Sequence, residues 1–159
     1  MRPERSARSR SAAETQALGR ALGRRLRGGD VVGLSGPLGA GKTCFVQGLA
    51  AGLGVPAGAA VTSPTFVLVA EYPGRVWLRH ADFYRVESYA RLLDAGFDDL
   101  LEPDGVLVVE WPERFPEALP AERLELRIEP AGGDERELRF TARGARAQEL
   151  VAELEAAWA

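Results

Sequence analysis

Hydrophobic residues recur along this chain at two spacings, and the shorter one predicts strands. Residues 106–109 are apolar without interruption, which is typical of a central parallel strand buried on both faces. Residues 124–128 and 137–141 alternate strictly around a Gly-Gly-Asp turn, so we expect an antiparallel hairpin with one wet face. The predicted strands are 31–35, 66–72, 76–81, 106–109, 124–128 and 137–141.

The longer spacing, of three to four residues, predicts helices. Ser11 and Glu14 form a capping box that starts the first helix, and Gly96 stops the third. The last helix is amphipathic and closes the chain. The predicted helices are 11–27, 43–53, 86–95 and 147–158.

Composition adds limits rather than a function. The 159 residues suffice for one domain, which we expect over 11–159, after a flexible Arg- and Ser-rich tail over 1–10. The net charge of −3 excludes a global basic field for nucleic acid. Every apolar run is shorter than the roughly 20 residues that span a bilayer, and the start is too short and polar for a secretory signal. We therefore expect a cytoplasmic protein without a membrane partner.

The loop between the first strand and its helix carries the clearest chemical motif. It reads Gly36-Pro37-Leu38-Gly39-Ala40-Gly41-Lys42-Thr43 and matches the Walker A pattern, G-x-x-x-x-G-K-[ST]. Backbone N–H groups and the helix N-terminus favour phosphate at such a loop. Lys42, the only lysine, would bridge the β- and γ-phosphates, and the Thr43 hydroxyl would hold Mg²⁺. Together with the predicted strands and helices, the motif predicts a P-loop NTPase-like fold, a three-layer α/β/α structure with a mixed sheet and a C-terminal antiparallel hairpin.

A P-loop enzyme also needs acids for Mg²⁺ and for ordering water. Glu110 is the best candidate, because it ends the 106–109 strand and ligands bind outside the carboxyl ends of such strands. Asp82 ends another predicted strand, and the pattern leaves open whether it serves the site, caps a helix or pairs with Arg85. His80, the only histidine, is interpreted as structural rather than as a catalytic base.

A polar segment before the second predicted strand supports two hypotheses. Ser63-Pro64-Thr65-Phe66 is either a simple turn or a switch loop in which Thr65 senses the γ-phosphate and Mg²⁺. Spacing alone does not separate these hypotheses.

Four motifs in a fixed order give the chain a family resemblance. They are the phosphate loop from Leu38 to Thr43, Ser63-Pro64-Thr65-Phe66, His80-x-Asp82-x-Tyr84-Arg85, and Glu110-Trp111-Pro112. In this order they resemble the TsaE (YjeE) family, the small ATPases of bacterial tRNA threonylcarbamoyladenosine (t6A) synthesis. The resemblance extends from about Ser11 to the C-terminal helix. Four ordered motifs are far more specific than a P-loop alone.

The resemblance implies a single P-loop domain that binds ATP or ADP with Mg²⁺. It gives catalytic roles to Lys42, Thr65, Asp82 and Glu110, with Thr65 as the switch threonine and Asp82 as the strand-end aspartate. It assigns Mg²⁺ to Thr43 and Glu110. The nucleotide-binding residues that it implies are Thr15 near the adenine, Leu38, Gly39, Ala40, Gly41, Lys42 and Thr43 in the loop, Trp111 beside the nucleotide, and Arg136.

The resemblance also implies partners. TsaD and TsaB proteins make t6A on tRNAs that read ANN codons, and ATP hydrolysis by TsaE is expected to reset their complex between turnovers. The tRNA would then reach this chain only indirectly, through the complex. Pro37 stands where the family usually has Asp, which removes an acid beside the phosphates and stiffens the loop. We therefore expect slow hydrolysis by the isolated protein.

Other classes of P-loop protein remain open from the residues alone. A small-molecule kinase needs lid arginines, and Arg114 and Arg123 flank a Pro-rich loop that could serve as a lid. A GTPase is disfavoured, because the chain has no Asn-Lys-x-Asp guanine motif. A nucleotide-binding adaptor that does not hydrolyse ATP is the third alternative.

Overall fold

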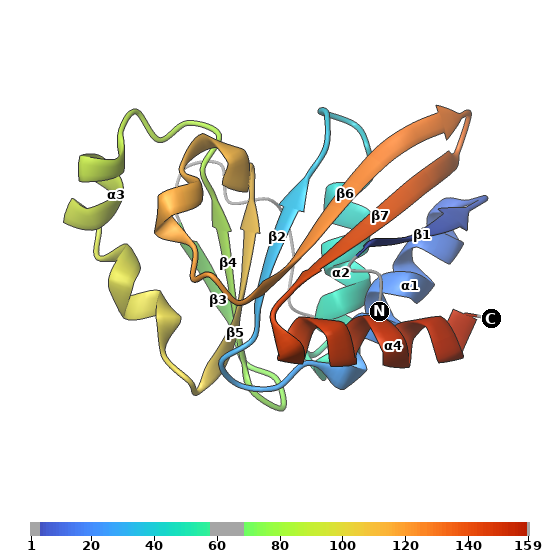
Figure 1. Ribbon diagram of the computed structural model, residues 1–159, viewed down its shortest axis with the longest axis horizontal. Helices are drawn as coiled ribbons and strands as arrows, with labels where there is room; N and C mark the ends of the chain where they lie inside the picture. Colours follow the sequence, from blue (N-terminus) through green and yellow to red (C-terminus); the bar gives the residue numbers. More distant parts are fainter. Residues whose placement is uncertain (1–3, 58–68, 159) are drawn as a thin grey trace.

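Seven strands form one mixed sheet in the computed structural model, which describes residues 4–57 and 69–158. In chain order they are β1 (Glu4–Ser9), β2 (Val31–Ser35), β3 (Val69–Tyr72), β4 (Trp77–Asp82), β5 (Gly105–Glu110), β6 (Arg123–Gly132) and β7 (Glu135–Arg143). Their order across the sheet is β1-β7-β6-β2-β5-β4-β3 (Figure 1). The inner strands β6, β2, β5 and β4 are parallel, whereas β7, β1 and β3 each join an antiparallel neighbour.

The sheet separates two layers of helices. One face is covered by α1 (Ala12–Arg25), α2 (Lys42–Gly52) and α4 (Ala145–Trp158), and the other by α3 (Tyr89–Asp94) with three 3-10 turns (Figure 1). The turns are η1 (Phe97–Leu101), η2 (Pro112–Arg114) and η3 (Pro116–Ala118). The prediction of a three-layer α/β/α fold with a mixed sheet and a C-terminal antiparallel hairpin is confirmed.

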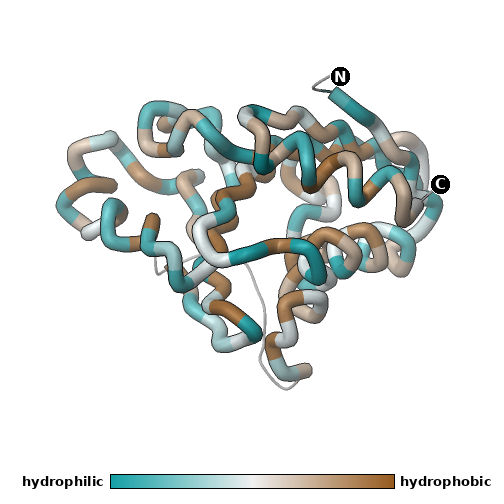
Figure 2. The backbone as a smooth tube through the Cα atoms, turned by 60° about the horizontal axis from the view of Figure 1, so that its bottom comes forward, coloured by the Kyte–Doolittle hydropathy of each residue, from teal (hydrophilic) through white to brown (hydrophobic). Residues whose placement is uncertain are grey.

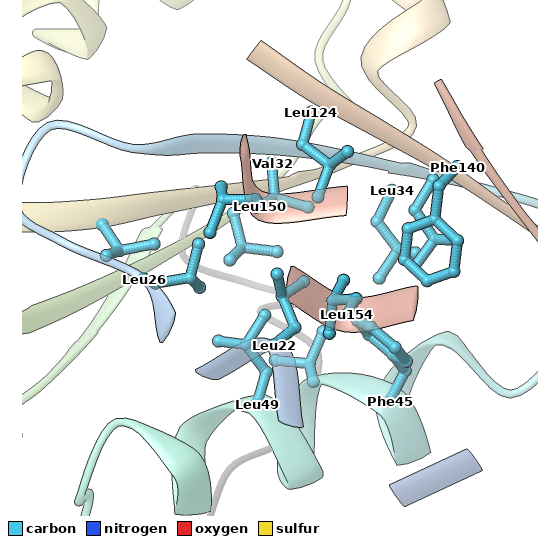
Figure 3. Close-up of a cluster of buried hydrophobic side chains, with 14 of the residues drawn as sticks. Leu22, Leu26, Val32, Leu34, Phe45, Leu49, Leu124, Phe140, Leu150 and Leu154 are labelled. Atoms are coloured by element: carbon cyan, nitrogen blue, oxygen red, sulfur yellow. The ribbon is translucent and has the colours of Figure 1, made fainter. Parts of the chain in front are cut away.

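Alternation along the inner strands decides which side chains face which layer. In β5, Val106 and Val108 pack with the helices α1, α2 and α4, whereas Leu107 and Val109 pack with α3 and the 3-10 turns. Figure 3 shows the first of these clusters, in which leucines of α1 and α4 meet Phe45 of α2 and the apolar side chains of the sheet. Position along a strand, odd or even, therefore assigns a residue to one side of the sheet.

Helices α1 and α2 pack with their backbones in contact. Gly19 and Gly23 of α1 face α2, and Gly48 and Gly52 of α2 face α1. A Cβ atom at any of the four would lie 2.1–2.3 Å from a carbonyl oxygen of the facing helix, far inside van der Waals contact. Only glycine permits this approach, which holds α1 against the helix that starts at the phosphate loop.

The prediction of a flexible N-terminal tail is wrong for Glu4–Ser9. This segment is the edge strand β1, which pairs antiparallel with β7. Ala7 packs against the core, and Arg5 Nε lies 2.5 Å from Glu155 Oε1 of α4. A polar segment can form a strand here because β7 supplies the backbone ladder and the segment has to bury only one of its faces.

The other predicted elements are found, most of them with shifted ends. The strand predicted at 31–35 has those bounds, and both hairpin strands are longer than predicted. The helix predicted at 86–95 is shorter, because Ser88 caps it and α3 begins only at Tyr89. The strand predicted at 66–72 is described only from residue 69, where β3 begins. The 3-10 turns were not predicted.

Hydrophobic segments in the fold are short. In Figure 2, brown and teal stretches alternate at close intervals along the tube. Within residues 4–57 and 69–158, no helix is long and apolar enough to cross a membrane.

Candidate nucleotide site

The site lies where three parallel strands end side by side. Asp82 of β4 is in register with Glu110 of β5, which is in register with Leu34 of β2. Two backbone bonds continue past the strand ends: Trp111 N–H donates to Leu34 C=O at 3.2 Å, and Phe83 N–H donates to Glu110 C=O at 3.0 Å. The predicted acids are therefore brought together at the carboxyl edge of the sheet, next to the start of the phosphate loop.

The phosphate loop joins β2 to α2, as its motif predicts. Gly36, Gly39 and Gly41 have φ angles of 144°, 78° and 100°, a region that side chains with a Cβ rarely adopt. At Gly36 a Cβ would also lie 2.3 Å from the Ile128 carbonyl oxygen of β6. These glycines are required by the path of the loop, which ends at the N-terminus of α2.

Lys42 is held inside the site. Its side chain is only 6% exposed, and its Nζ donates to the Gly36 carbonyl at 2.6 Å and lies 3.8 Å from the centroid of the Trp111 ring. Burial lowers the pKa of Lys42, while the carboxylates of Glu110 and Asp82 act in the opposite direction. The two strand-end acids thus offset part of the effect of burial on this cation.

The two acids differ in their partners. The Glu110 side chain is 3% exposed, and its Oε2 lies 2.6 Å from Nε2 of the fully buried His80. Asp82 Oδ1 accepts the Tyr84 N–H at 2.9 Å instead of capping a helix. Burial raises the pKa of Asp82, and the nearby charge of Glu110 raises it further, against the effect of the Tyr84 N–H. His80 thus contacts a predicted catalytic residue, and its interpretation as structural rather than catalytic stays a prediction.

Trp111 has an unusual backbone. Its φ of 58° makes it the one non-glycine residue with positive φ in the described part of the chain. Its ring packs against Tyr84, with the centroids 4.9 Å apart, and receives the Lys42 ammonium described above. Strained residues of this kind concentrate at functional sites.

Arg136 and Thr15 contact the phosphate loop near Ala40 and Gly41. Arg136 Nε donates to the Ala40 carbonyl at 2.8 Å, so this residue clamps the loop backbone. The Thr15 hydroxyl is buried 2.6 Å from Ser9 Oγ, while its methyl group faces Gly41. Both predicted residues thus lie beside the phosphate loop, Thr15 with its methyl group rather than its hydroxyl toward it.

The remaining predicted residues divide into three groups. Leu38 is exposed at the tip of the loop, and Thr43 lies in the first turn of α2. Thr65 lies outside the described residues, so its role stays a prediction. The arginines considered for a lid have other partners: Arg114 donates to the Tyr84 and Val86 carbonyls, and Arg123 to Pro120 C=O and Glu125.

The residues present suit Mg²⁺ bound together with a nucleotide. A hydroxyl and a carboxylate, from Thr43 and Glu110, are hard oxygen donors of the kind that Mg²⁺ prefers. Within the described residues, no group of three or more His, Cys, Asp or Glu side chains could hold a metal by itself. Mg²⁺ in such sites takes one or two protein ligands and completes its shell with phosphates and water, so this donor set fits.

Sequence reasoning missed the contact between His80 and Glu110. The signal was present in part, because His80 and Glu110 lie at even positions of strands whose even positions face α2. What the pattern lacks is the register between β4 and β5, which brings the two side chains together.

Comparisons with known proteins agree with one another. The sequence model of the family described as "Threonylcarbamoyl adenosine biosynthesis protein TsaE" matches residues 9–138. The Bacillus subtilis (strain 168) protein named tRNA threonylcarbamoyladenosine biosynthesis protein TsaE is 44% identical over 89% of this chain and 87% of its own length. A relative of the same name from Streptomyces coelicolor is 47% identical over 74% of this chain and 80% of its own length. The crystal structure of Bacillus subtilis YdiB superimposes with a TM-score of 0.84 at 38% identity, and covers 99% of this chain and 97% of that chain.

Proposed function

The chain belongs to the TsaE family, and from that premise we propose that it is an ATPase that supports tRNA threonylcarbamoyladenosine (t6A) modification. It would do so in the cytoplasm by nucleotide-dependent docking on a complex of TsaD and TsaB homologues. The observation that carries the proposal is the convergence at one sheet edge of the Walker A lysine, Lys42, with the strand-end acids Glu110 and Asp82.

The phosphate chain of ATP would lie along the loop, where backbone N–H groups and the N-terminus of α2 attract negative charge. Lys42 would leave the Gly36 carbonyl, its partner at 2.6 Å, and donate to the phosphates instead. Exchange of a neutral carbonyl for an anionic oxygen strengthens each bond that the ammonium makes. Arg136, bonded to Ala40 C=O, would keep the loop backbone in shape during this exchange.

Thr43 and Glu110 would hold Mg²⁺ with the phosphates, and the bound ion supplies neutralisation of the charge on the β- and γ-phosphates. Asp82, next to Glu110 in register, would order the attacking water. Water attacks the γ-phosphorus, the bond to the ADP oxygen breaks, and the proton of the water ends on the released phosphate or in solvent. The Trp111 ring, which contacts the Lys42 ammonium in the structure, would form one wall of the site.

We expect the isolated protein to hydrolyse ATP slowly, because the phosphate loop contains no acid and the arginines considered for a lid are not free. Pro37 supplies no acid beside the phosphates, and the arginines near the 3-10 turns, Arg114 and Arg123, are bonded to backbone carbonyls and to Glu125. We propose that docking on the TsaD–TsaB complex stimulates hydrolysis, and that the Ser63–Phe66 segment with Thr65 couples the nucleotide state to the partner surface.

The test is a reconstituted assay. Wild-type protein should bind a fluorescent ATP analogue, and its hydrolysis should rise when TsaD and TsaB homologues are added. Lys42→Ala should weaken binding by about 10- to 150-fold, since a charge-assisted bond contributes roughly 1.5–3 kcal/mol. Arg139→Ala, on the exposed face of the hairpin, is the control and should bind as the wild type does. Unchanged affinity of folded Lys42→Ala, or phosphate transfer to a small hydroxylated metabolite without any effect of the partners, would overturn the proposal.

A further inference from the structure

His80 makes a single close polar contact within the described residues, and that contact is with Glu110. The imidazole has no exposed surface, and its Nε2 lies 2.6 Å from Glu110 Oε2. Its other nitrogen, Nδ1, is buried without a hydrogen-bond partner in the part of the chain that the structure describes. A buried polar group with one unmet position costs stability, so the ring has a reason to be there other than filling space.

The contact determines which nitrogen carries the hydrogen. An ionised carboxylate only accepts hydrogen bonds, so Nε2 must donate to Glu110. Glu110 therefore holds the ring with its Nε2–H directed at the carboxylate.

The strand register gives this bond its direction. His80 lies one position before Ala81 on β4, opposite Val108 of β5, so it reaches Glu110 from the neighbouring strand toward the strand end. Both side chains lie on the α2 side of the sheet, where Lys42 begins its helix. The bond thus fixes one carboxylate oxygen, and with it the rotation of the whole carboxylate group.

We propose that His80 is a positioning residue for Glu110, which holds that carboxylate in the orientation required to bind Mg²⁺ with the nucleotide. The inference rests on the proposed function. Partners that orient a metal-binding carboxylate typically change metal affinity by about 10- to 100-fold when they are removed. Because His80 is fully buried and its close polar contact is with Glu110, it would act on the metal through that carboxylate rather than by binding metal or nucleotide itself.

The experiment separates the hydrogen bond from the volume of the ring. His80→Phe keeps the ring volume but has no donor, and His80→Gln carries an amide N–H at about the reach of Nε2. ADP affinity is measured by calorimetry over a series of Mg²⁺ concentrations and in EDTA. His80→Phe should need about 10- to 100-fold more Mg²⁺ for its half-maximal gain in ADP affinity, while its ADP affinity in EDTA stays that of the wild type. His80→Gln should restore the Mg²⁺ dependence.

Two controls keep the outcome decisive. In a Glu110→Gln background, His80→Phe should cause no further change in the Mg²⁺ dependence. If His80→Phe does not fold, His80→Asn serves in its place, because its shorter amide cannot reach Glu110. If His80→Phe shows the Mg²⁺ dependence of the wild type, or loses ADP affinity equally with and without Mg²⁺, the inference about His80 is overturned. The proposed function is not affected by either result. Wild-type protein that binds no ADP under any condition overturns the proposed function as well.

Discussion

At the scale of single residues, Asp82 is a candidate catalytic acid whose burial lowers the stability of the folded protein at neutral pH. It is half-buried at the end of β4, and burial, aided by the charge of Glu110, raises the pKa of its carboxyl group. The folded protein therefore holds this proton more tightly than the unfolded chain does. Stability from this group is greatest below its ordinary pKa of 3.8 and is lost as pH rises through the raised folded value.

Asp82→Asn should consequently raise the melting temperature at pH 7. The amide keeps the shape of the side chain and can still accept the Tyr84 N–H, but it carries no charge to be desolvated. Melting curves between pH 7 and pH 4.5 should show the advantage shrinking toward acid, while ATP turnover is lower at every pH. Asp98→Asn, at an exposed position, is the control, with an expected change within about 0.5 kcal/mol. A variant at Asp82 that melts below the wild type at pH 7 would contradict the expected direction of the pKa shift.

At the scale of elements, the close contact of α1 and α2 through glycines predicts that a Gly→Ala change there destabilises the protein instead of stabilising it. Gly→Ala inside a helix ordinarily stabilises by about 1 kcal/mol. At Gly48 the new Cβ would lie 2.1 Å from the Gln16 carbonyl oxygen, so the helices must separate. We expect Gly48→Ala to lower the free energy of unfolding by about 1–3 kcal/mol, and to weaken nucleotide binding because α2 starts at the phosphate loop.

Chemical denaturation and ADP titration of the same samples check this expectation. Ala51→Ser, at an exposed position of α2, is the control and should change stability by no more than about 0.5 kcal/mol. A stabilised Gly48→Ala would show that the helices tolerate a wider spacing.

A second element-scale prediction concerns the end of α1. Arg75 donates to the carbonyls of Leu26 and Gly23, both at 3.0 Å, and so satisfies helix-end acceptors from a distant loop. Arg75→Ala should cost about 1.5–3 kcal/mol, and each kcal/mol lowers the melting temperature by about 2–4 °C. Arg91→Ala removes only the exposed pair with Glu87 and should leave the melting temperature nearly unchanged. Equal melting temperatures for the two variants would count against the capping role.

At the scale of the whole molecule, the inner strands of the sheet were predictable, whereas the edge strand β1 was not. Strands β2 and β5 bury both faces, so their residues must be apolar and the pattern is visible in the sequence. The edge strand β1 is rich in Arg and Ser and exists because β7 pairs with it, which the six residues themselves do not reveal. Local patterns predict an element only where the residues of that element determine it.

The site follows the same division. Lys42 and the strand-end acids came from the Walker A motif and from strand boundaries, both of which are local. The clamp of Arg136 on Ala40 and the contact of His80 with Glu110 join segments that are 96 and 30 positions apart, and depend on strand register. Arg136 and Thr15 were predicted only through the family resemblance, since no periodicity distinguishes them.

The solitary lysine of this chain has a consequence for experiment. A lysine-specific protease finds one susceptible bond in the whole sequence, between Lys42 and Thr43, and that bond lies where a 6% exposed side chain begins a helix. Cleavage into fragments 1–42 and 43–159 therefore requires the phosphate loop to open. Nucleotide at 100 times its Kd stabilises the closed loop by about 2.7 kcal/mol, which corresponds to about 100-fold slower digestion. The rate at which the intact chain disappears on a gel would then report occupancy of the site in the unlabelled protein. If nucleotide left this digestion rate unchanged, it would not be bound at that loop.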